Sequence, residues 1–75
     1  MTKVQLKQVQ KIREAIEELA SKLEDFRSEA QSLFDEKSET WQDSDAGQQY
    51  EAELDYLAGA DDGLQTALEE LDNIA

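Results

Sequence analysis

The sequence predicts an all-α protein: a coiled-coil-like antiparallel hairpin of two helices that pairs with a second copy into a four-helix assembly. Three observations lead to this prediction. Apolar residues recur every three or four positions in the first half of the chain, and they do so again in the second half. The basic residues are confined to the first half. A seam with an average step of 3.5 residues is typical of helices that pack lengthwise against each other.

The first helix is predicted from about residue 3 to residue 38. Thr2 and Gln5 have the spacing of a capping box, which marks its start. The seam of this helix consists of residues that step alternately by three and four: Val9, Ile12, Ile16, Leu19, Leu23, Phe26, Ala30 and Leu33. A stripe of this length is unstable in water, so we expect a second helix to cover it.

Further apolar residues widen this face. Ala15, Ala20 and Phe34 flank the seam and extend it beyond what one partner helix covers. Exposed apolar surface of this kind usually marks an interface. We therefore expect a homodimer.

The connection is predicted at about residues 39–45, where serine, threonine and aspartate cluster. These side chains compete with helical hydrogen bonding and favour caps and turns. Asp45, with Gln48 three residues later, would cap the second helix, and Thr40 or Asp43 are alternative caps.

The second helix is predicted at about residues 46–74. Its seam again steps by three and four: Tyr50, Leu54, Leu57, Asp61, Leu64, Leu68, Leu71 and Ala75. The charged member, Asp61, is expected to pair with Arg27. It lies in the stretch Gly59–Gly63, where each glycine costs about 1 kcal/mol of helix stability relative to alanine. We expect a kink or break there, or a full turn that divides the chain into three helices.

Charge predicts how the helices are oriented. Residues 1–37 hold all 7 basic residues, whereas residues 38–75 hold 11 acidic residues and no basic one. The basic start of the first helix and the acidic end of the second, at Glu69, Glu70 and Asp72, both oppose their own helix dipoles. An antiparallel arrangement places them side by side and relieves both conflicts.

Composition limits the classes of function. The chain has 75 residues, 19 acidic against 7 basic, with a net charge of −12. Such a charge disfavours direct binding to nucleic acid or to an anionic membrane and permits a protein partner with a basic surface. The chain lacks histidine and cysteine, the residues most used as general bases and metal ligands. We expect no enzyme activity, no cofactor, no metal, no membrane span and a cytoplasmic location.

Acidic residues on the outer face of the second helix form the candidate binding surface. The candidate partner-binding residues are Glu51, Asp55, Tyr56, Asp62, Glu69, Asp72 and Trp41. The acids either form a solvated face or imitate the charge of a nucleic-acid backbone. Tyr56 lies off the seam and should be exposed. Trp41 either anchors a partner or closes the end of the hairpin against Phe34 and Tyr50.

Two resemblances centre on the connection. A long helix, a tryptophan turn, and then Gly47 and Tyr50 on a second amphipathic helix resemble the Trp-x-Gly family of small secreted helical hairpins. Gly47 follows Trp41 by six residues instead of two, so only the hairpin layout carries over. Separately, the segment Phe34–Gln42 with Gly47 and Tyr50 resembles small acidic proteins encoded by bacteriophages and plasmids. This resemblance implies no particular activity, although small acidic phage proteins often inhibit host enzymes.

The expected function is therefore that of a non-enzymatic interaction protein. We expect an inhibitor that binds a basic surface of a nucleic-acid-handling or defence protein. The most specific version of this hypothesis is that the inhibitor mimics a nucleic acid. A structural or assembly module whose charge serves solubility is one alternative, and a secretion-system hairpin is another.

Overall fold

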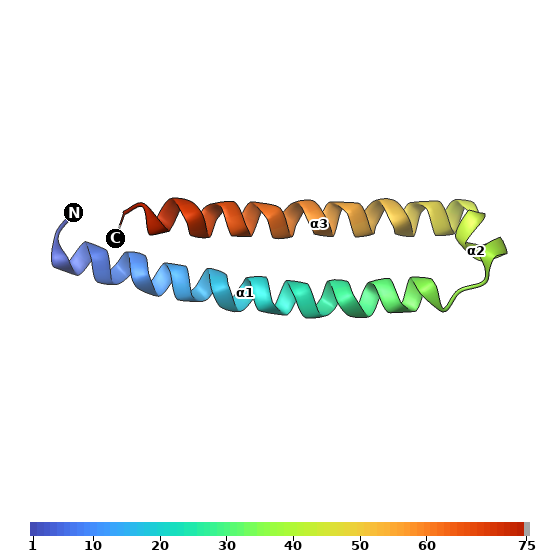
Figure 1. Ribbon diagram of the computed structural model, residues 1–75, viewed down its shortest axis with the longest axis horizontal. Coiled ribbons are helices and arrows are strands. Elements are labelled where there is room, and N and C mark those ends of the chain that lie inside the picture. Colours follow the sequence, from blue (N-terminus) through green and yellow to red (C-terminus); the bar gives the residue numbers. More distant parts are fainter. Residues whose placement is uncertain (75) are drawn as a thin grey trace.

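The computed structural model describes residues 1–74, which form a hairpin of two long antiparallel helices joined by a short one (Figure 1). Helix α1 spans Lys3–Asp35, α2 spans Glu39–Asp43 and α3 spans Asp45–Asp72. The Cα atoms extend over 58 × 15 × 13 Å, and the start of α1 and the end of α3 lie together at one end of the rod. The prediction of an all-α antiparallel hairpin is confirmed.

Helix α1 begins at the predicted capping box. The Thr2 hydroxyl accepts the Gln5 amide at 3.1 Å, and the Gln5 side chain accepts the Thr2 amide at 2.9 Å. The helix ends at Asp35, three residues before the predicted end. It ends there because Ser38 takes the extended conformation of an N-cap and accepts the backbone N–H of Trp41.

The connection differs from the prediction. It contains helix α2, and Ser44 caps α3 in place of Asp45, Thr40 or Asp43. The Ser44 hydroxyl accepts the Gly47 amide at 3.2 Å and also donates to the carbonyl of Trp41. One serine therefore ends α2 and begins α3, and Asp45 falls in the first turn, where its charge suits the helix dipole.

Helix α3 runs unbroken through Gly59–Gly63, so the predicted break there is wrong. Both glycines are exposed, and their cost of about 1 kcal/mol each is small for the helix as a whole. The leucines on either side, Leu57 and Leu64, are half-buried on the inner face. Burying a leucine side chain is worth roughly 1.5–3 kcal/mol when complete, which favours a continuous helix.

The inner face of α3 is the predicted seam. Its members from Tyr50 to Leu71 are all half-buried, whereas Ala75 lies outside the described residues. The inner face of α1 differs from the predicted seam by a rotation. The residues that it turns toward α3 are Val9, Arg13, Ile16, Ala20, Leu23, Arg27, Ala30 and Phe34.

Every second member of the predicted α1 seam is consequently exposed. The exposed fractions are 53% for Ile12, 54% for Leu19, 57% for Phe26 and 50% for Leu33. The expectation that α3 covers the whole stripe is thus wrong for these four residues. Two buried alanines, Ala20 and Ala30, explain the rotation because small side chains allow close helix packing.

The closed hairpin can be checked by distance measurement. Neighbouring packed helices have axes about 8–10 Å apart, so spin labels at Lys7→Cys and Glu70→Cys should lie roughly 10–20 Å apart within one chain. Dilution with unlabelled protein removes contributions from a second copy. An intrachain distance near the length of α1, about 50 Å, would contradict the closed hairpin.

Candidate protein-binding surface

An aromatic cluster closes the connected end of the hairpin. The ring centroid of Phe34 lies 6.2 Å from that of Trp41 and 5.7 Å from that of Tyr50. The Tyr50 hydroxyl also donates to the Ala30 carbonyl at 2.9 Å, which links α3 to α1. The Lys37 ammonium lies 5.3 Å from the centroid of the Trp41 ring, a cation–π contact.

Trp41 is therefore a half-buried member of this cluster. Of the two roles considered for it, the structure favours closure of the hairpin end. Trp41 thus belongs to the connected end of the hairpin and not to the exposed acidic side of α3.

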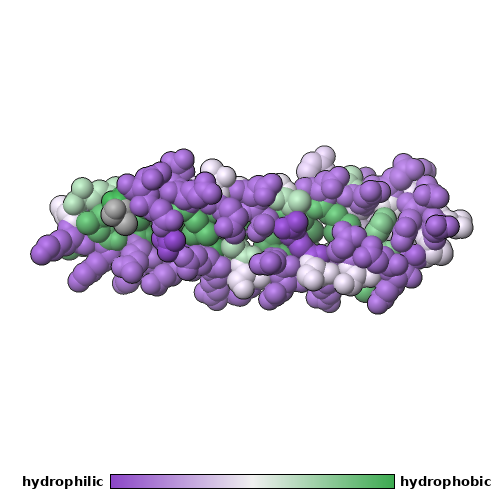
Figure 2. All heavy atoms as spheres, in the orientation of Figure 1, coloured by the Kyte–Doolittle hydropathy of each residue, from purple (hydrophilic) through white to green (hydrophobic). Residues whose placement is uncertain are grey.

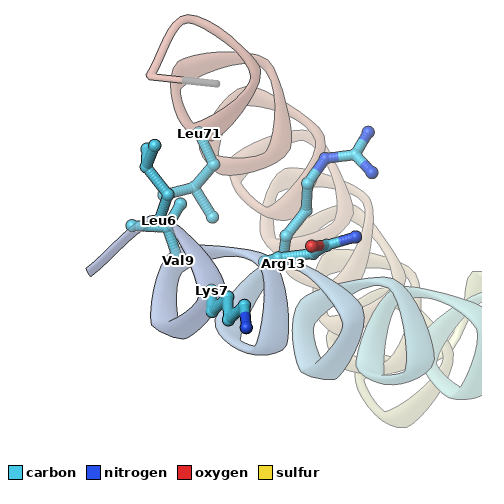
Figure 3. A pocket seen from close by; sticks show the side chains of 6 residues that line it. Leu6, Lys7, Val9, Arg13 and Leu71 are labelled. Carbon is cyan, nitrogen blue, oxygen red and sulfur yellow. The ribbon is translucent and has the colours of Figure 1, made fainter. Parts of the chain in front are cut away.

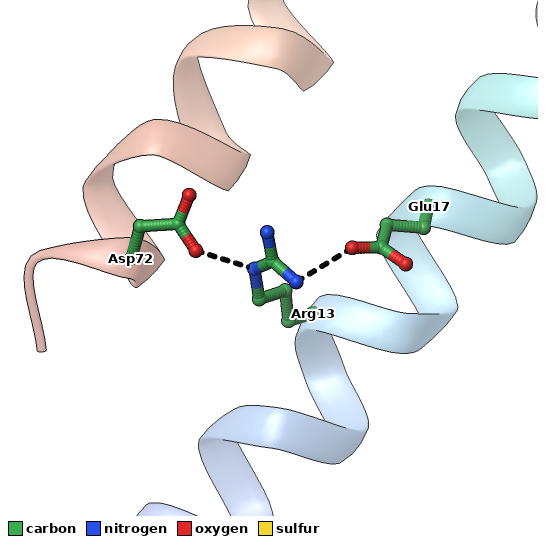
Figure 4. Close-up of polar contacts among 3 residues, drawn as sticks. All are labelled: Arg13, Glu17 and Asp72. Carbon is green, nitrogen blue, oxygen red and sulfur yellow. Dashed lines mark ion pairs between the residues drawn. The ribbon is translucent and has the colours of Figure 1, made fainter. Parts of the chain in front are cut away.

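Two arginines on the inner edge of α1 pair with acids of α3. Arg13 Nε lies 2.7 Å from Asp72, and its Nη1 lies 2.7 Å from Glu17 on the same helix (Figure 4). Arg27 donates to Asp61 at 3.1 Å, as predicted. These pairs connect opposite helices at two levels and confirm the expected proximity of the basic and acidic ends. Asp72 of the candidate set thus has its charge partly compensated.

The other candidate acids of α3 are exposed. Asp55, Asp62 and Glu69 are spaced seven residues apart and form one row along the helix. At about 1.5 Å of rise per residue, neighbours in this row are roughly 10 Å apart. Glu51 is also exposed, and Tyr56 is 77% exposed beside Asp55, as expected.

Charge is distributed very unevenly between the two long helices. Helix α3 carries nine acidic residues and no basic one, whereas α1 carries seven acidic and six basic residues. Figure 2 shows hydrophilic side chains along both long edges of the molecule and apolar patches between them. The outer side of α3 is therefore an uncompensated anionic surface on a rigid helix.

A shallow pocket of about 390 Å³ lies at the open end of the hairpin (Figure 3). Its lining consists of Leu6, Lys7, Val9, Gln10, Arg13 and Leu71. These residues supply aliphatic groups, one amide and two cations, but no carboxylate, hydroxyl or thiol. The Arg13 side chain is already engaged by Glu17 and Asp72. The pocket therefore lacks the acid–base pair that most hydrolytic or proton-transfer chemistry requires.

Two other kinds of feature are absent from residues 1–74. No group of three or more potential ligand side chains is arranged to hold a metal ion there. None of the helices described is both long enough and apolar enough to cross a bilayer.

The exposed row Ile12, Leu19, Phe26 and Leu33 was missed as a separate surface by the sequence analysis. Its signal is present in the sequence as a seven-residue spacing. By periodicity, these four residues are indistinguishable from the other members of the predicted seam. Only the packing of α1 on α3 shows that they are exposed while the others are buried or half-buried.

Comparisons of the chain with protein-family models, with curated proteins and with solved structures found no match.

Proposed function

We propose that the protein is a non-enzymatic inhibitor that binds a basic surface of a nucleic-acid-handling or defence protein through the outer side of α3. The observation that supports this proposal most directly is the row of Asp55, Asp62 and Glu69 on a helix with no basic residue.

The density of charge indicates what α3 can imitate. Seven of the nine carboxylates of α3 are not engaged by an arginine, because Asp61 pairs with Arg27 and Asp72 pairs with Arg13. Over a helix of about 42 Å this is roughly one charge per 6 Å. A single DNA strand carries about one charge per 3.4 Å, and a duplex carries one per about 1.7 Å. Helix α3 thus resembles one strand more than a duplex, and a groove that follows one strand is its best match.

The rigidity of the helix favours such binding. The acids are placed on a continuous helix that packs on α1 along its length, so little backbone order is lost on association. The field of the uncompensated charge would also raise the association rate with a basic partner.

We also infer that the protein acts as a homodimer. The row Ile12, Leu19, Phe26 and Leu33 supports this because four large apolar side chains remain at least half-exposed. The same row favours a second candidate function, that of an assembly module in which the acidic residues only maintain solubility.

Affinity capture from bacterial lysate distinguishes the two functions. The immobilised protein is incubated with lysate at about 50 mM and about 500 mM salt, with and without added DNA. Mimicry predicts capture of nucleic-acid-binding proteins, and high salt should abolish it. Salt screens exposed charges, and the screening length falls from about 10 Å at 0.1 M to about 3 Å at 1 M. Added DNA should compete for the same proteins.

The opposite results identify the assembly module. Capture of the protein's own chain alone, or of partners that neither salt nor DNA displaces, would contradict the proposed inhibition. A matched column carrying an acidic helical protein of similar net charge removes proteins that bind any anionic surface.

A further inference from the structure

One broad side of the hairpin carries two parallel rows with a seven-residue spacing. On α1 the row is Ile12, Leu19, Phe26 and Leu33, whose side chains are large and at least half-exposed. The corresponding row on α3 contains three alanines and one glutamate and is continued by Ile74, two residues past the end of the helix: Ala46, Glu53, Ala60, Ala67 and Ile74. Phe26 and Glu53 border one small hollow of about 100 Å³ between the helices, so both rows flank the same side.

We propose that this side binds a second copy of the chain, with α1 of each copy lying over α3 of the other. The two-fold axis then runs parallel to the helices. This inference rests on the homodimer proposed above and specifies its interface and orientation. It is independent of the acidic row, which lies on the outer side of α3.

In this arrangement, large side chains of α1 lie at the same height along the rod as small side chains of the second copy's α3. The Arg27–Asp61 and Arg13–Asp72 pairs fix which residues of α1 and α3 lie at the same level. A two-fold axis parallel to the helices preserves these levels in the facing copy. Phe26 consequently lies over the second copy's Ala60, and Leu19 lies over its Ala67.

The ends of the rows follow the same register. At the connected end, Leu33 lies at about the level of the second copy's Glu53, the one charged member of the α3 row. Ile12 lies at about the level of the second copy's Ile74, which is 39% exposed. Large side chains thus face small ones in the middle of the rod, and two aliphatic side chains meet at its open end. Matching of large with small side chains is how packed helices interdigitate.

Charge selects this orientation over the other two-fold arrangement. An axis perpendicular to the helices would stack α3 on α3, which brings together two helices with nine acidic residues each. The proposed axis places each α3 between two α1 helices, and α1 carries six of the seven basic residues. Only Glu53 of the acidic residues of α3 belongs to the row that faces the second copy, so the preference comes from the summed field of each helix, which repels a second α3 and attracts α1.

The size of the face is sufficient for a stable dimer. The Cα atoms span 58 by 15 Å across the two helices, and a typical stable interface buries about 800 Å² per partner. The interface is isologous, so each copy supplies both rows.

Sedimentation velocity of the whole protein and two point variants tests the interface. The parent should be dimeric at tens of micromolar, and Phe26→Lys should dissociate at least about tenfold more readily because it buries a charge at the centre of the interface. Ser28→Lys adds the same charge on the same helix but on the opposite side, and should dimerise as the parent does. Circular dichroism checks that helicity is retained, which is expected because Phe26 is 57% exposed in the monomer.

Disulfide cross-linking tests the orientation, because the chain has no cysteine of its own. Mild oxidation of the double variant Phe26→Cys/Ala60→Cys should give a covalent dimer, whereas Phe26→Cys alone should cross-link much more slowly. Equal rates for the two variants would show α1 facing α1 and overturn the proposed orientation while the homodimer stands. A parent protein that is monomeric throughout this concentration range would overturn both the interface and the homodimer.

Discussion

Reversing Asp55, Asp62 and Glu69 to lysine is expected to abolish capture of the basic partner, which corresponds to a loss in affinity of more than about 100-fold. The three residues form the exposed row of α3, so the variant replaces attraction with repulsion along the whole contact. Like-charge juxtaposition across an interface costs several kcal/mol, and each 1.4 kcal/mol is tenfold in affinity. Isothermal titration against a protein captured at low salt measures the loss directly.

The control must distinguish the effect of reversing charge at this position on α3 from the effect of changing the net charge of the protein. Glu14, Glu24 and Asp25 are exposed on α1, and their reversal to lysine changes the net charge by the same amount. This control should weaken binding only through the lower overall field, by about tenfold or less. Both variants should stay helical, because surface substitutions usually change stability within about 0.5 kcal/mol each. Equal losses in the two variants would assign the effect to net charge and contradict a binding surface on α3.

Local signals predicted the parts of the fold that depend on residues close in sequence or on charge. The Thr2–Gln5 box was predicted correctly because a capping box is a contact between residues three apart. The antiparallel orientation was predictable because all the basic residues lie in one half of the chain. The Arg27–Asp61 pair followed from that orientation and from the position of the turn.

The rotation of α1 was not predictable from periodicity. The apolar face of α1 is wider than one partner helix, and seams that include either Phe26 or Arg27 share the residues Leu23 and Ala30. By hydropathy, the side of this face that carries Phe26 is the better candidate to pack on α3. Packing favours the other edge, because Ala20 permits close approach and Arg27 reaches Asp61 there. Because α1 packs on α3 through the side that carries Arg27, the side that carries Phe26 stays exposed. This exposed side is the interface proposed for the second copy.

The start of α3 could not be predicted from the sequence for a different reason. Ser44 and Asp45 are both good N-cap residues, so their identities do not decide between them. The decision depends on tertiary contact, because α2 turns the chain and its end lies against Gly47 at the start of α3. Likewise, propensity predicted a weak point at Gly59–Gly63, where the packing of the flanking leucines keeps α3 continuous.

Gly47 leads to the second large effect, a loss of stability on substitution by alanine. Gly47 is buried, and a Cβ atom there would overlap the carbonyl oxygens of Trp41 and Gln42. Its φ angle is negative, so the requirement is one of space and not of backbone conformation. The obstacle is backbone, which cannot move aside like a flexible side chain. We expect Gly47→Ala to lower the free energy of unfolding by about 1–3 kcal/mol, the usual cost of overpacking.

The matched control for this substitution is Gly59→Ala, for which the predicted sign is opposite. A Cβ atom at Gly59 meets nothing within 4 Å, and alanine is the better helix former by about 1 kcal/mol. Urea unfolding followed by circular dichroism compares the two variants. It is done at one fixed protein concentration, because the proposed dimerisation would add stability that depends on concentration. Stabilisation by Gly47→Ala would contradict the close packing of α2 on α3. Loss of stability in Gly47→Ala together with a gain in Gly59→Ala would establish that Gly47 holds the turn, and with it Trp41, against the start of the acidic helix.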